Sequence, residues 1–562
     1  MKKMKLVGLV TLVLGLLFTV SSVYAEPWKF GIMSDTQWKA NLDGENPETV
    51  AVGIIKQLNQ EFINHEVKFV IQVGDLADKE TDSPNGFPEN RTMDTRAAAA
   101  QPLYDAGICF FPLRGNHEGS ATAAGELPVL FPQTSGGGMT CGVANFSSPF
   151  AALNGLSYSF DYENARFILL DQFTRPDGTN YNGTSNDNLI DQLPWIETTL
   201  TEKGADKHGF VFSHKELMGA NHRDVITGGD PSANPEAQNS FYRILQDNGV
   251  RYEIGGHDHN HMRSIVVSPD GQSSLQNIIT SSNSYKFYTP QIPSNDEKYD
   301  LEAFGFLRET PIVQELYTIG YYIVTVDGPR VTVDHYASDN GCGGILGASV
   351  DCDLTVTPEL EIFKRETFGY SLNGKEFRIA QGESYAVVAD SFRNTHARIL
   401  DGTNASEEMI YDGRSTIKDV NTGWTSKYEE EKSCYKSRKN HWHNPWNKRE
   451  LASDILTIWG MADLGEEETD TYVLSMSYDK KPVHLGNGGF GVATRNADGD
   501  WVNAVDMNFE GSEKFVVGPW KPGYELGTYG IDPRSKTAWA VLNYNGDFAV
   551  ARDIEPVHGH RR

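Results

Sequence analysis

EIGGHDHNH, at residues 253–261, places His257 and His259 two residues apart, directly after a glycine pair and a short apolar run. A short apolar run that ends in polar residues is typical of a buried strand, and sites in α/β sheets gather at strand ends. Similar apolar runs recur along the chain, each ending in a polar cluster. They are WKFGIMSD, VKFVIQVGD, GICFFPLRGN, ARFILLDQ, HGFVFSH and VRYEIGGH. These runs are long enough and apolar enough to be buried strands.

Helix-like segments lie between several of these runs. Residues 48–66 follow the start signal NPE, and LPWIETTLTEKG at 193–204 ends in a glycine. Strands that alternate with helices predict a layered α/β domain over about 28–335. Residues 317–338 predict two further strands joined through DGP, a hairpin that would close this domain.

The chain has 562 residues, more than one hydrophobic core usually organises, so two domains are expected. We place their boundary near residue 355, at the end of the glycine-rich junction DNGCGGILGASVDCD. Beyond it, short strands alternate with turns and few long helical periods occur. The sequence therefore predicts an α/β domain over 26–355 and an all-β accessory domain, arranged as a sandwich, over 356–562.

A charged segment with several aromatic residues, 427–450, lacks strand alternation and is interpreted as a surface loop. His441 and His443 repeat the two-residue spacing there, but no strand or glycine pair precedes them. A solvated loop is therefore favoured over a metal site. Trp442 and Trp446 could contact a sugar or a partner protein, or simply pack the loop.

The first 25 residues have a basic start, an apolar middle and a small-residue exit. We interpret 1–25 as a cleaved signal peptide. An uncleaved membrane anchor is the alternative, although the apolar stretch is short for a span of roughly 20 residues. No later segment is apolar enough to span a membrane. The mature protein is therefore expected to be exported, either periplasmic or extracellular.

An oxidising compartment allows cysteines to pair, but the five cysteines cannot all pair within one chain. Cys342 and Cys352 flank a short glycine-rich loop that closes easily, so they are favoured as a disulfide. Cys109 lies in the apolar run GICFFPL and is interpreted as a buried free thiol.

The formal net charge is −27, and it becomes about −30 once the lysines at positions 2, 3 and 5 leave with the signal (−27 minus 3). This acidic excess argues against nucleic acid as a stable partner. Any site for a phosphate group must therefore create its positive potential locally.

Carboxylates, imidazoles and amides at strand ends form a donor set suited to a pair of metal ions. Two ions about 3.5–4 Å apart can polarise a phosphoryl oxygen and lower the pKa of a bound water. The motifs within 28–335 resemble those of the calcineurin-like metallophosphoesterases, which include purple acid phosphatases and their bacterial relatives. In family order they are MSDTQ, VGDLAD, RGNHE, FVFSHKE and EIGGHDHNH. The resemblance implies a four-layer α/β/β/α sandwich and a dinuclear metal site.

Carried over motif by motif, the resemblance implies two sets of metal ligands that share Asp75. One set is Asp35, Gln37, Asp75 and His259, and the other is Asp75, Asn116, His214 and His257. In the same motifs, His117 is a histidine that binds no metal. It would orient the substrate phosphate or protonate the departing alcohol.

Three further residues are candidates for supporting roles. Glu118 could hold the imidazole of His117 in position, and His261 could line the cleft. Asp78 could orient a metal ligand, or it could cap the start of a helix. The histidines without a motif context are interpreted as structural. They are His65, His208, His222 and His335.

Gln37 departs from the family pattern, in which the first motif usually ends in histidine. An amide oxygen is a harder donor than imidazole, so this site should prefer iron, manganese, magnesium or calcium over zinc. Alternatively, Gln37 binds no metal and the first site is weak or empty. The identity of the ions stays open among Fe, Mn, Zn, Mg and Ca.

The resemblance implies a secreted metal-dependent phosphoric-ester hydrolase in which a metal-bound hydroxide attacks phosphorus. Exported members commonly scavenge phosphate from small organic esters, so a broad-specificity phosphatase is expected. A phosphodiesterase or nucleotidase is the alternative within the same class. A non-catalytic metal-containing surface binding protein is the alternative from a different class. The sequence does not determine the oligomeric state.

Overall fold

The structure is a computed structural model of the chain. The residues that it describes are 26–37, 50–77, 92–181, 186–219, 221–284, 286–288, 308–339, 350–351, 357, 359–372, 386–387, 395–401, 414–416, 421–425, 451–459, 467–479, 488–552 and 554. The expected signal peptide at 1–25 and the loop at 427–450, with His441, Trp442, His443 and Trp446, lie outside these residues. Within them, no helix is both long enough and apolar enough to cross a membrane.

The first sheet has six strands in the order β16-β14-β13-β1-β2-β3. These are β1 (Trp28–Met33), β2 (Phe69–Val73), β3 (Cys109–Leu113), β13 (Thr318–Asp327), β14 (Arg330–Asp339) and β16 (Phe363–Ser371). Strands β1, β2 and β3 are parallel, so their carboxyl ends meet at one edge. β13 and β14 form the hairpin that the sequence predicted.

The second sheet has nine strands in the order β19-β12-β9-β10-β8-β7-β6-β5-β4. These are β4 (Ala144–Ser147), β5 (Tyr158–Tyr162), β6 (Ala165–Leu170), β7 (His208–Ser213), β8 (Tyr252–Gly255), β9 (His261–Val267), β10 (Ser274–Ile279), β12 (Glu309–Glu315) and β19 (Arg414–Thr416). Strands β6, β7 and β8 are parallel. Their carboxyl ends therefore also meet at one edge.

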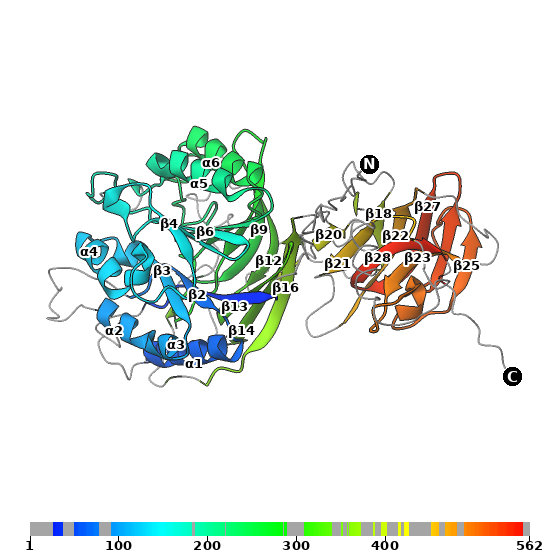
Figure 1. The fold of residues 1–562 in the computed structure, drawn as a ribbon, viewed down its shortest axis with the longest axis horizontal. Coiled ribbons are helices and arrows are strands. Elements are labelled where there is room, and N and C mark those ends of the chain that lie inside the picture. The colour runs from blue at the N-terminus through cyan, green and yellow to red at the C-terminus, as the bar shows by residue number, and fades with distance from the viewer. Residues whose placement is uncertain are drawn as a thin grey trace, which may run out of the picture.

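Helices cover the outer face of each sheet (Figure 1). They are α1 (Val50–Asn64), α2 (Thr92–Ala99), α3 (Gln101–Asp105), α4 (Ala121–Leu130), α5 (Leu193–Lys203) and α6 (Pro235–Asp247). The core under α1 to α4 contains helix-facing residues of β2 and β3, and the core under α5 and α6 contains helix-facing residues of β6 and β7.

Alternation along each strand connects these layers, because successive side chains point to opposite faces of a sheet. In β6, Phe167 and Leu169 lie in the core between the two sheets, whereas Ile168 and Leu170 lie in the core beneath α5 and α6. The N-terminal fold is therefore an α/β/β/α sandwich, and the prediction of this fold is confirmed.

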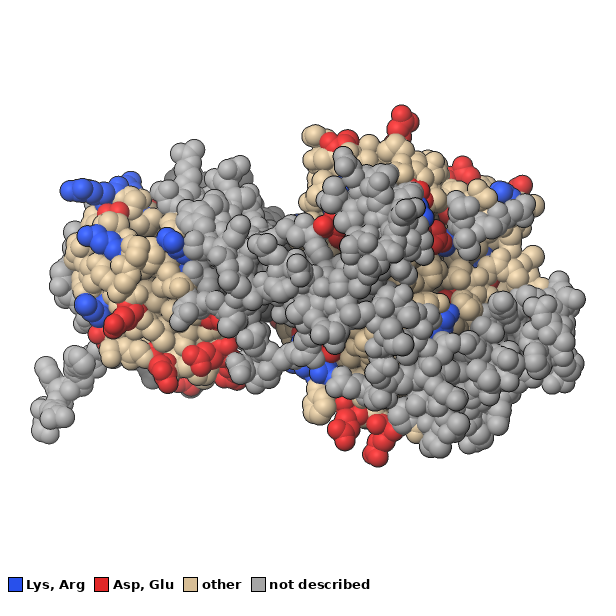
Figure 2. Space-filling view, turned by 180° about the vertical axis from the view of Figure 1, so that it is seen from behind, with Lys and Arg blue, Asp and Glu red and all other residues tan. Residues whose placement is uncertain are grey.

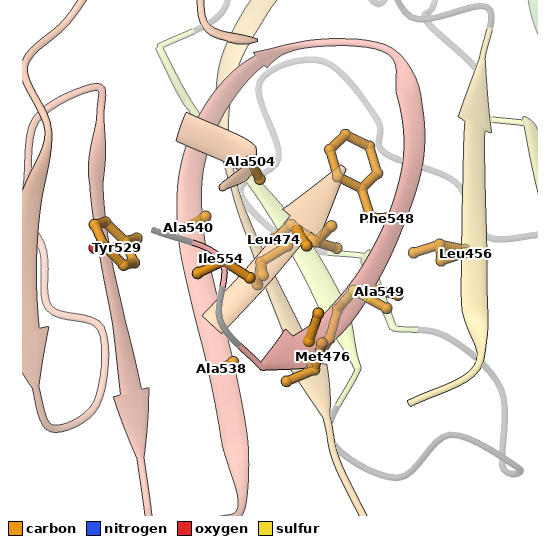
Figure 3. Close-up of a cluster of buried hydrophobic side chains, with 14 of the residues drawn as sticks. Leu456, Leu474, Met476, Ala504, Tyr529, Ala538, Ala540, Phe548, Ala549 and Ile554 are labelled. Atoms are coloured by element: carbon orange, nitrogen blue, oxygen red, sulfur yellow. The ribbon is translucent and has the colours of Figure 1, made fainter. Parts of the chain in front are cut away.

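The C-terminal region is largely β and consists of two packed sheets (Figure 1). One contains β17 (Ala386–Val387), β18 (His396–Asp401), β22 (Glu468–Ser477), β27 (Thr537–Tyr544), β26 (Thr528–Asp532) and β25 (Lys514–Val517). The other contains β20 (Asn421–Thr425), β21 (Ile455–Trp459), β28 (Gly546–Arg552), β23 (Phe490–Arg495) and β24 (Trp501–Asn503). Leu474 and Ala540 of one sheet and Phe548 of the other share a single core (Figure 3).

Two strands from beyond residue 355 complete the N-terminal sheets. β16 pairs with β14 of the first sheet, and β19 pairs with β12 of the second. Arg330 of β14 also contacts the C-terminal sandwich, with its guanidinium carbon 5.6 Å from the Trp459 ring centroid and a nitrogen 3.7 Å from Asp547. Strand pairing therefore joins residues on the two sides of position 355. The domain limits 26–355 and 356–562 stay a prediction.

Cys109 is paired, contrary to the expectation of a free thiol. It forms a disulfide with Cys141, at a sequence separation of 32 residues. Its apolar context predicted burial, which is correct because the side chain is 0% exposed. The local sequence could not identify the partner, because Cys141 lies beyond α4 in the sequence and meets Cys109 of β3 only in the folded chain. Cys342 and Cys352 lie outside the described residues, so their pairing stays a prediction.

Candidate metal centre

The two sheets contribute different donors to one place. The first sheet supplies Asp35 after β1, Asp75 after β2 and Asn116 after β3, all at its carboxyl edge. The second sheet supplies His214 after β7, and His257 and His259 after β8. Carboxylates and an amide from one sheet thus meet imidazoles from the other.

Five of these residues form two groups that could each hold a metal ion. One group is Asp35, Asp75 and His259, and the other is Asp75, His214 and His257. Within each group the ligand atoms lie within 4.8 Å of one another. All five residues are buried, and none is more than 4% exposed as a whole residue. Asp75 belongs to both groups, as a bridging ligand would.

Asp35 lies in the first group, with Oδ1 3.5 Å from Nε2 of His259. Its carboxylate accepts hydrogen bonds from the Ser34 hydroxyl at 2.5 Å and from the backbone N–H of His257 at 3.1 Å. Burial raises the pKa of Asp35 to about 7, because the charged form loses its hydration. A carboxylate in this position needs a proton or a nearby cation.

Gln37 lies beside the same group. Its amide nitrogen is 2.9 Å from Oδ2 of Asp75 and 2.8 Å from Nε2 of His259. Its oxygen Oε1 is buried and has no hydrogen-bond partner within the described chain. A buried oxygen without a partner is costly, and a metal ion beside it would remove that cost.

His214 and Asn116 lie at the second group. Nε2 of His214 is 3.2 Å from Oδ1 of Asp75 and 2.9 Å from Oδ1 of Asn116. Its other nitrogen, Nδ1, is 3.1 Å from the carbonyl oxygen of Val73. Burial disfavours the charged ring, but the Asp75 carboxylate outweighs burial and raises the pKa of His214 to about 9. The carboxylates therefore attract positive charge to this point.

The other two histidines are poised as neutral donors. Burial, aided by His222, lowers the pKa of His257 to about 4, and burial also lowers the pKa of His259 well below its ordinary value. Metal ligation requires the neutral imidazole. Both rings are thus in the protonation state that a metal ion needs.

His117 lies on the exposed side of Asp75. Its side chain is 17% exposed, against 1% for Asp75, and its Nε2 is 3.8 Å from Oδ2 of that carboxylate. Its backbone N–H donates to Oδ1 of Asp75 at 3.0 Å. Glu118 braces the same loop, because its two carboxylate oxygens accept the backbone N–H groups of Ala77 and Gly115.

His261 is part of the sheet packing. Its Nδ1 is 2.7 Å from the Tyr322 hydroxyl, its Nε2 is 3.2 Å from Glu366, and the residue is 0% exposed. These contacts join β9 to β13 and β16, whereas neither metal-holding group includes His261. Asp78 lies outside the described residues, so its role stays a prediction.

His222 and Asp224 reach the site although sequence analysis did not select them. The His222 ring stacks on that of His257, with centroids 3.9 Å apart, and its Nδ1 is 2.6 Å from Oδ1 of Asp258. An oxygen of Asp224 lies 3.5 Å from Nε2 of His257. Both residues lie in the loop after β7, several residues beyond the end of that strand. No apolar run directly precedes them, so no periodic signal identifies them. The acidic residue inside HDH is the one sequence signal that points to this loop, because the Asp258 carboxylate accepts hydrogen bonds from backbone N–H groups of the loop.

The backbone at the site adopts uncommon conformations. Asp35, Asp75, His257 and His259 have positive φ angles of 50°, 43°, 70° and 54°. Such angles are uncommon for residues with a side chain, and those found cluster at functional sites. Sharp turns directly after the strands thus aim these four side chains at one another.

Glycines allow the loops to approach closely. A Cβ on Gly115 would overlap Asp75, and one on Gly74, whose φ is +82°, would overlap the His214 ring. A Cβ on Gly256 would lie 2.7 Å from Oδ2 of Asp35 and 2.8 Å from the carbonyl oxygen of Val73. The glycines of the GD, GN and GGH motifs are therefore packing requirements of the two groups.

Residues 29–261 match the family model described as calcineurin-like phosphoesterase. These residues belong to the calcineurin-like metallophosphoesterase superfamily. This is a family of phosphoric ester hydrolases that use a dinuclear metal site. The two buried groups of this metallophosphoesterase, joined by Asp75, supply the donors for such a site. The unpartnered oxygen of Gln37 fits a metal ion as well.

Several solved structures are similar to this metallophosphoesterase at low identity. A dimetal phosphatase from Danio rerio is 17% identical over 55% of this chain and 95% of that chain, with a TM-score of 0.34. A purple acid phosphatase from yellow lupin (Lupinus luteus) seeds is 15% identical over 62% of this chain and 54% of that chain, with a TM-score of 0.38. The anchor protein in the inner membrane complex of Plasmodium is 13% identical over 59% of this chain and 90% of that chain, with a TM-score of 0.32. A search of curated proteins found no match.

Proposed function

We propose that this metallophosphoesterase is an exported, broad-specificity phosphatase that acts on small phosphate esters. The observation that carries the proposal is the sharing of Asp75 between two buried groups of donors. Asp35, Gln37, Asp75 and His259 would hold one ion. Asp75, Asn116, His214 and His257 would hold the other.

The electrostatics of the site support an anionic substrate. When bound, two divalent ions would polarise the phosphoryl oxygens and supply the attacking water in an ionised form. They would add four positive charges against the two carboxylates Asp35 and Asp75. The site would then be positive although the chain has a formal charge of −27. Acidic side chains are exposed on both the N-terminal and the C-terminal sandwich (Figure 2). The short-range field of the site prevails there, because distant surface charges are screened.

His117 is the candidate acid for the leaving group. It is the most exposed of the motif histidines: its side chain is 17% exposed, against 0%, 5% and 1% for His214, His257 and His259. A partly exposed imidazole beside Asp75 can orient a phosphate oxygen or deliver a proton to the departing alcohol. No structural metal site would require such a residue.

Two observations support export. The first 25 residues have the order of regions found in signal peptides. The disulfide between Cys109 and Cys141 is of a kind that persists in oxidising compartments. Expression of the full chain, followed by N-terminal sequencing of the protein recovered outside the cytoplasm, tests this part. Recovery with an intact N-terminus would contradict it.

The enzyme proposal is tested with the mature protein, reconstituted in turn with Mn, Fe, Zn, Ca and Mg. Turnover of p-nitrophenyl phosphate well above that of its bis ester is expected. Preference for the bis ester, or for nucleotides in a wider panel, would favour a phosphodiesterase or nucleotidase instead. Absence of turnover with every ion, in a protein that binds two metals, would favour the non-catalytic binding protein.

The His117→Ala variant separates catalysis from metal binding. Turnover should fall by about 10²–10⁴-fold, the usual contribution of a general acid or base, while metal content stays near two per chain. Asp75→Ala is the matched variant, because it should lose metal from both sites. Equal metal loss in the two variants would show that the role of His117 is assigned wrongly.

A further inference from the structure

Two ligand histidines share one arrangement of their ring nitrogens. Nδ1 of His214 lies 3.1 Å from the carbonyl oxygen of Val73, and Nδ1 of His259 lies 2.9 Å from that of Lys286. A neutral imidazole carries one N–H, and a carbonyl can only accept it. In the neutral form that binds a metal ion, Nδ1 is therefore the protonated nitrogen of both rings, and Nε2 keeps its lone pair for the metal site.

His257 has the opposite arrangement. Its Nε2 is 3.5 Å from Oδ1 of Asp224, which is slightly longer than a usual N–H···O hydrogen bond. This Nε2 is buried and has no hydrogen-bond partner within the described chain, so the carboxylate is the acceptor within reach. Nδ1 is then the nitrogen that remains for the group with Asp75 and His214.

Asp224 is itself held firmly. Its Oδ2 lies 2.7 Å from Nζ of Lys215, whose side chain is 0% exposed. The same ammonium lies 3.1 Å from Oδ2 of Asp187. Lys215 directly follows His214, and its backbone N–H donates to Gln172 at 2.9 Å. One lysine thus ties the carboxylate that faces His257 to the strand end that carries His214.

We propose that Asp224 is a positioning residue that accepts the Nε2–H of His257, so that this ring offers Nδ1 to the metal, with Lys215 holding the carboxylate in place. The inference rests on the proposed dinuclear site. A carboxylate acceptor fixes the tautomer and raises the basicity of the imidazole more than a backbone carbonyl does. His257 would therefore be the ligand most dependent on a side-chain partner, and its metal the one most affected by that partner.

The test measures metal binding without substrate. Metal-free Asp224→Asn is titrated with Mn²⁺ or Zn²⁺ in competition with a chromophoric chelator, and the bound metal is counted. One of the two dissociation constants should rise by about 10–100-fold, the usual effect of losing such a partner, while the other stays unchanged. Asp224→Glu, which keeps the charge opposite Lys215, should recover part of the affinity at the same site.

Asp187→Asn is the matched control. It removes the second carboxylate from the same lysine, but this carboxylate contacts Lys215 rather than His257. It should lower the melting temperature and leave both metal affinities unchanged. Equal weakening in Asp187→Asn and Asp224→Asn, or wild-type affinity in Asp224→Asn, would overturn the inference.

Two further outcomes have fixed meanings. If Asp224→Asn does not fold, Asp224→Glu decides: weakening confined to one site supports the inference, and unchanged or evenly reduced affinity overturns it. If the wild-type protein binds two ions but hydrolyses no ester, the proposed function fails. The positioning role of Asp224 would still be measured by the same titration.

Discussion

Gln37 and His259 face each other at 2.8 Å, measured between the side-chain amide nitrogen and Nε2. The oxygen of the same amide is buried without a hydrogen-bond partner in the described chain. The two ends of an amide have nearly the same shape, so turning it by 180° exchanges oxygen and nitrogen without moving the chain. Gln37 can therefore present an oxygen donor to an ion held by His259, Asp35 and Asp75.

Gln37→His should shift the ion preference of the first site toward zinc, because imidazole is a softer donor than an amide oxygen. The measurement is equilibrium dialysis against equal concentrations of Mn²⁺ and Zn²⁺, followed by elemental analysis. Gln60→His, at an exposed position of α1, is the control for adding a histidine elsewhere. An unchanged ratio of the two metals would mean that Gln37 does not contact the ion.

Much of the N-terminal fold could be predicted from local pattern. The apolar runs became β1, β2, β3, β6, β7 and β8, and residues 48–66 contain α1 (Val50–Asn64). The predicted helix at 193–204 is α5, which ends at Lys203 and is followed by Gly204 with a φ of 80°. These elements are predictable because burial on one or both faces leaves a periodic signal in the sequence.

Features that depend on distant pairing were not predictable. β16 and β19 join sheets whose other strands lie upstream in the sequence. The residue pattern of a strand does not indicate which other strand it pairs with. The partner of Cys109 was missed for the same reason. At the site, the motif residues were found through the family resemblance. His222 and Asp224 were not, because a loop side chain that reaches a site by a tertiary contact has no spacing rule.

Gly256→Ala should disturb the metal centre. The new Cβ would lie 2.7 Å from Oδ2 of Asp35 and 2.8 Å from the carbonyl oxygen of Val73, so the loop that carries His257 must shift. Overpacking of this kind typically costs about 1–3 kcal/mol of unfolding free energy. Metal affinity should fall as well, which chelator competition measures.

Gly125→Ala is the control for that prediction. Gly125 lies in α4, and a Cβ there would meet nothing within 4 Å. Alanine is the better helix former, so this variant should gain about 0.5–1 kcal/mol with unchanged metal affinity. A Gly256→Ala protein with wild-type stability and metal affinity would show that the loop has more room than the structure indicates.

Glu253→Gln should make stability less dependent on pH. Glu253 is 0% exposed, and burial raises its pKa from 4.5 to about 8. The unfolded chain loses this proton near pH 4.5, whereas the folded chain keeps it until about pH 8. The group's contribution to stability is therefore lost progressively as pH rises through that window, by an amount on the order of a few kcal/mol.

Glutamine keeps the volume and the acceptor for the Ser213 hydroxyl, which donates to Glu253 at 2.6 Å. The melting temperature of the metal-saturated variant should match that of wild type at pH 5 and exceed it at pH 8. Glu197→Gln, where the side chain is 49% exposed and remains hydrated in the fold, is the control for the same chemical change. A difference between Glu253→Gln and wild type that does not vary with pH would contradict the prediction.

Replacing both Cys109 and Cys141 by alanine should lower the free energy of unfolding by about 2–4 kcal/mol, because the disulfide closes a loop in the unfolded chain. Denaturant unfolding of the variant and of wild type with and without reductant measures the effect. Reduced wild type and the variant should unfold at similar denaturant concentrations, both below oxidised wild type. Cys109 lies in β3, in the same sheet as β1 and β2. The loss of the disulfide should therefore destabilise the whole N-terminal sandwich. Unfolding midpoints that coincide for all three samples would show that Cys109 is not paired in the folded protein.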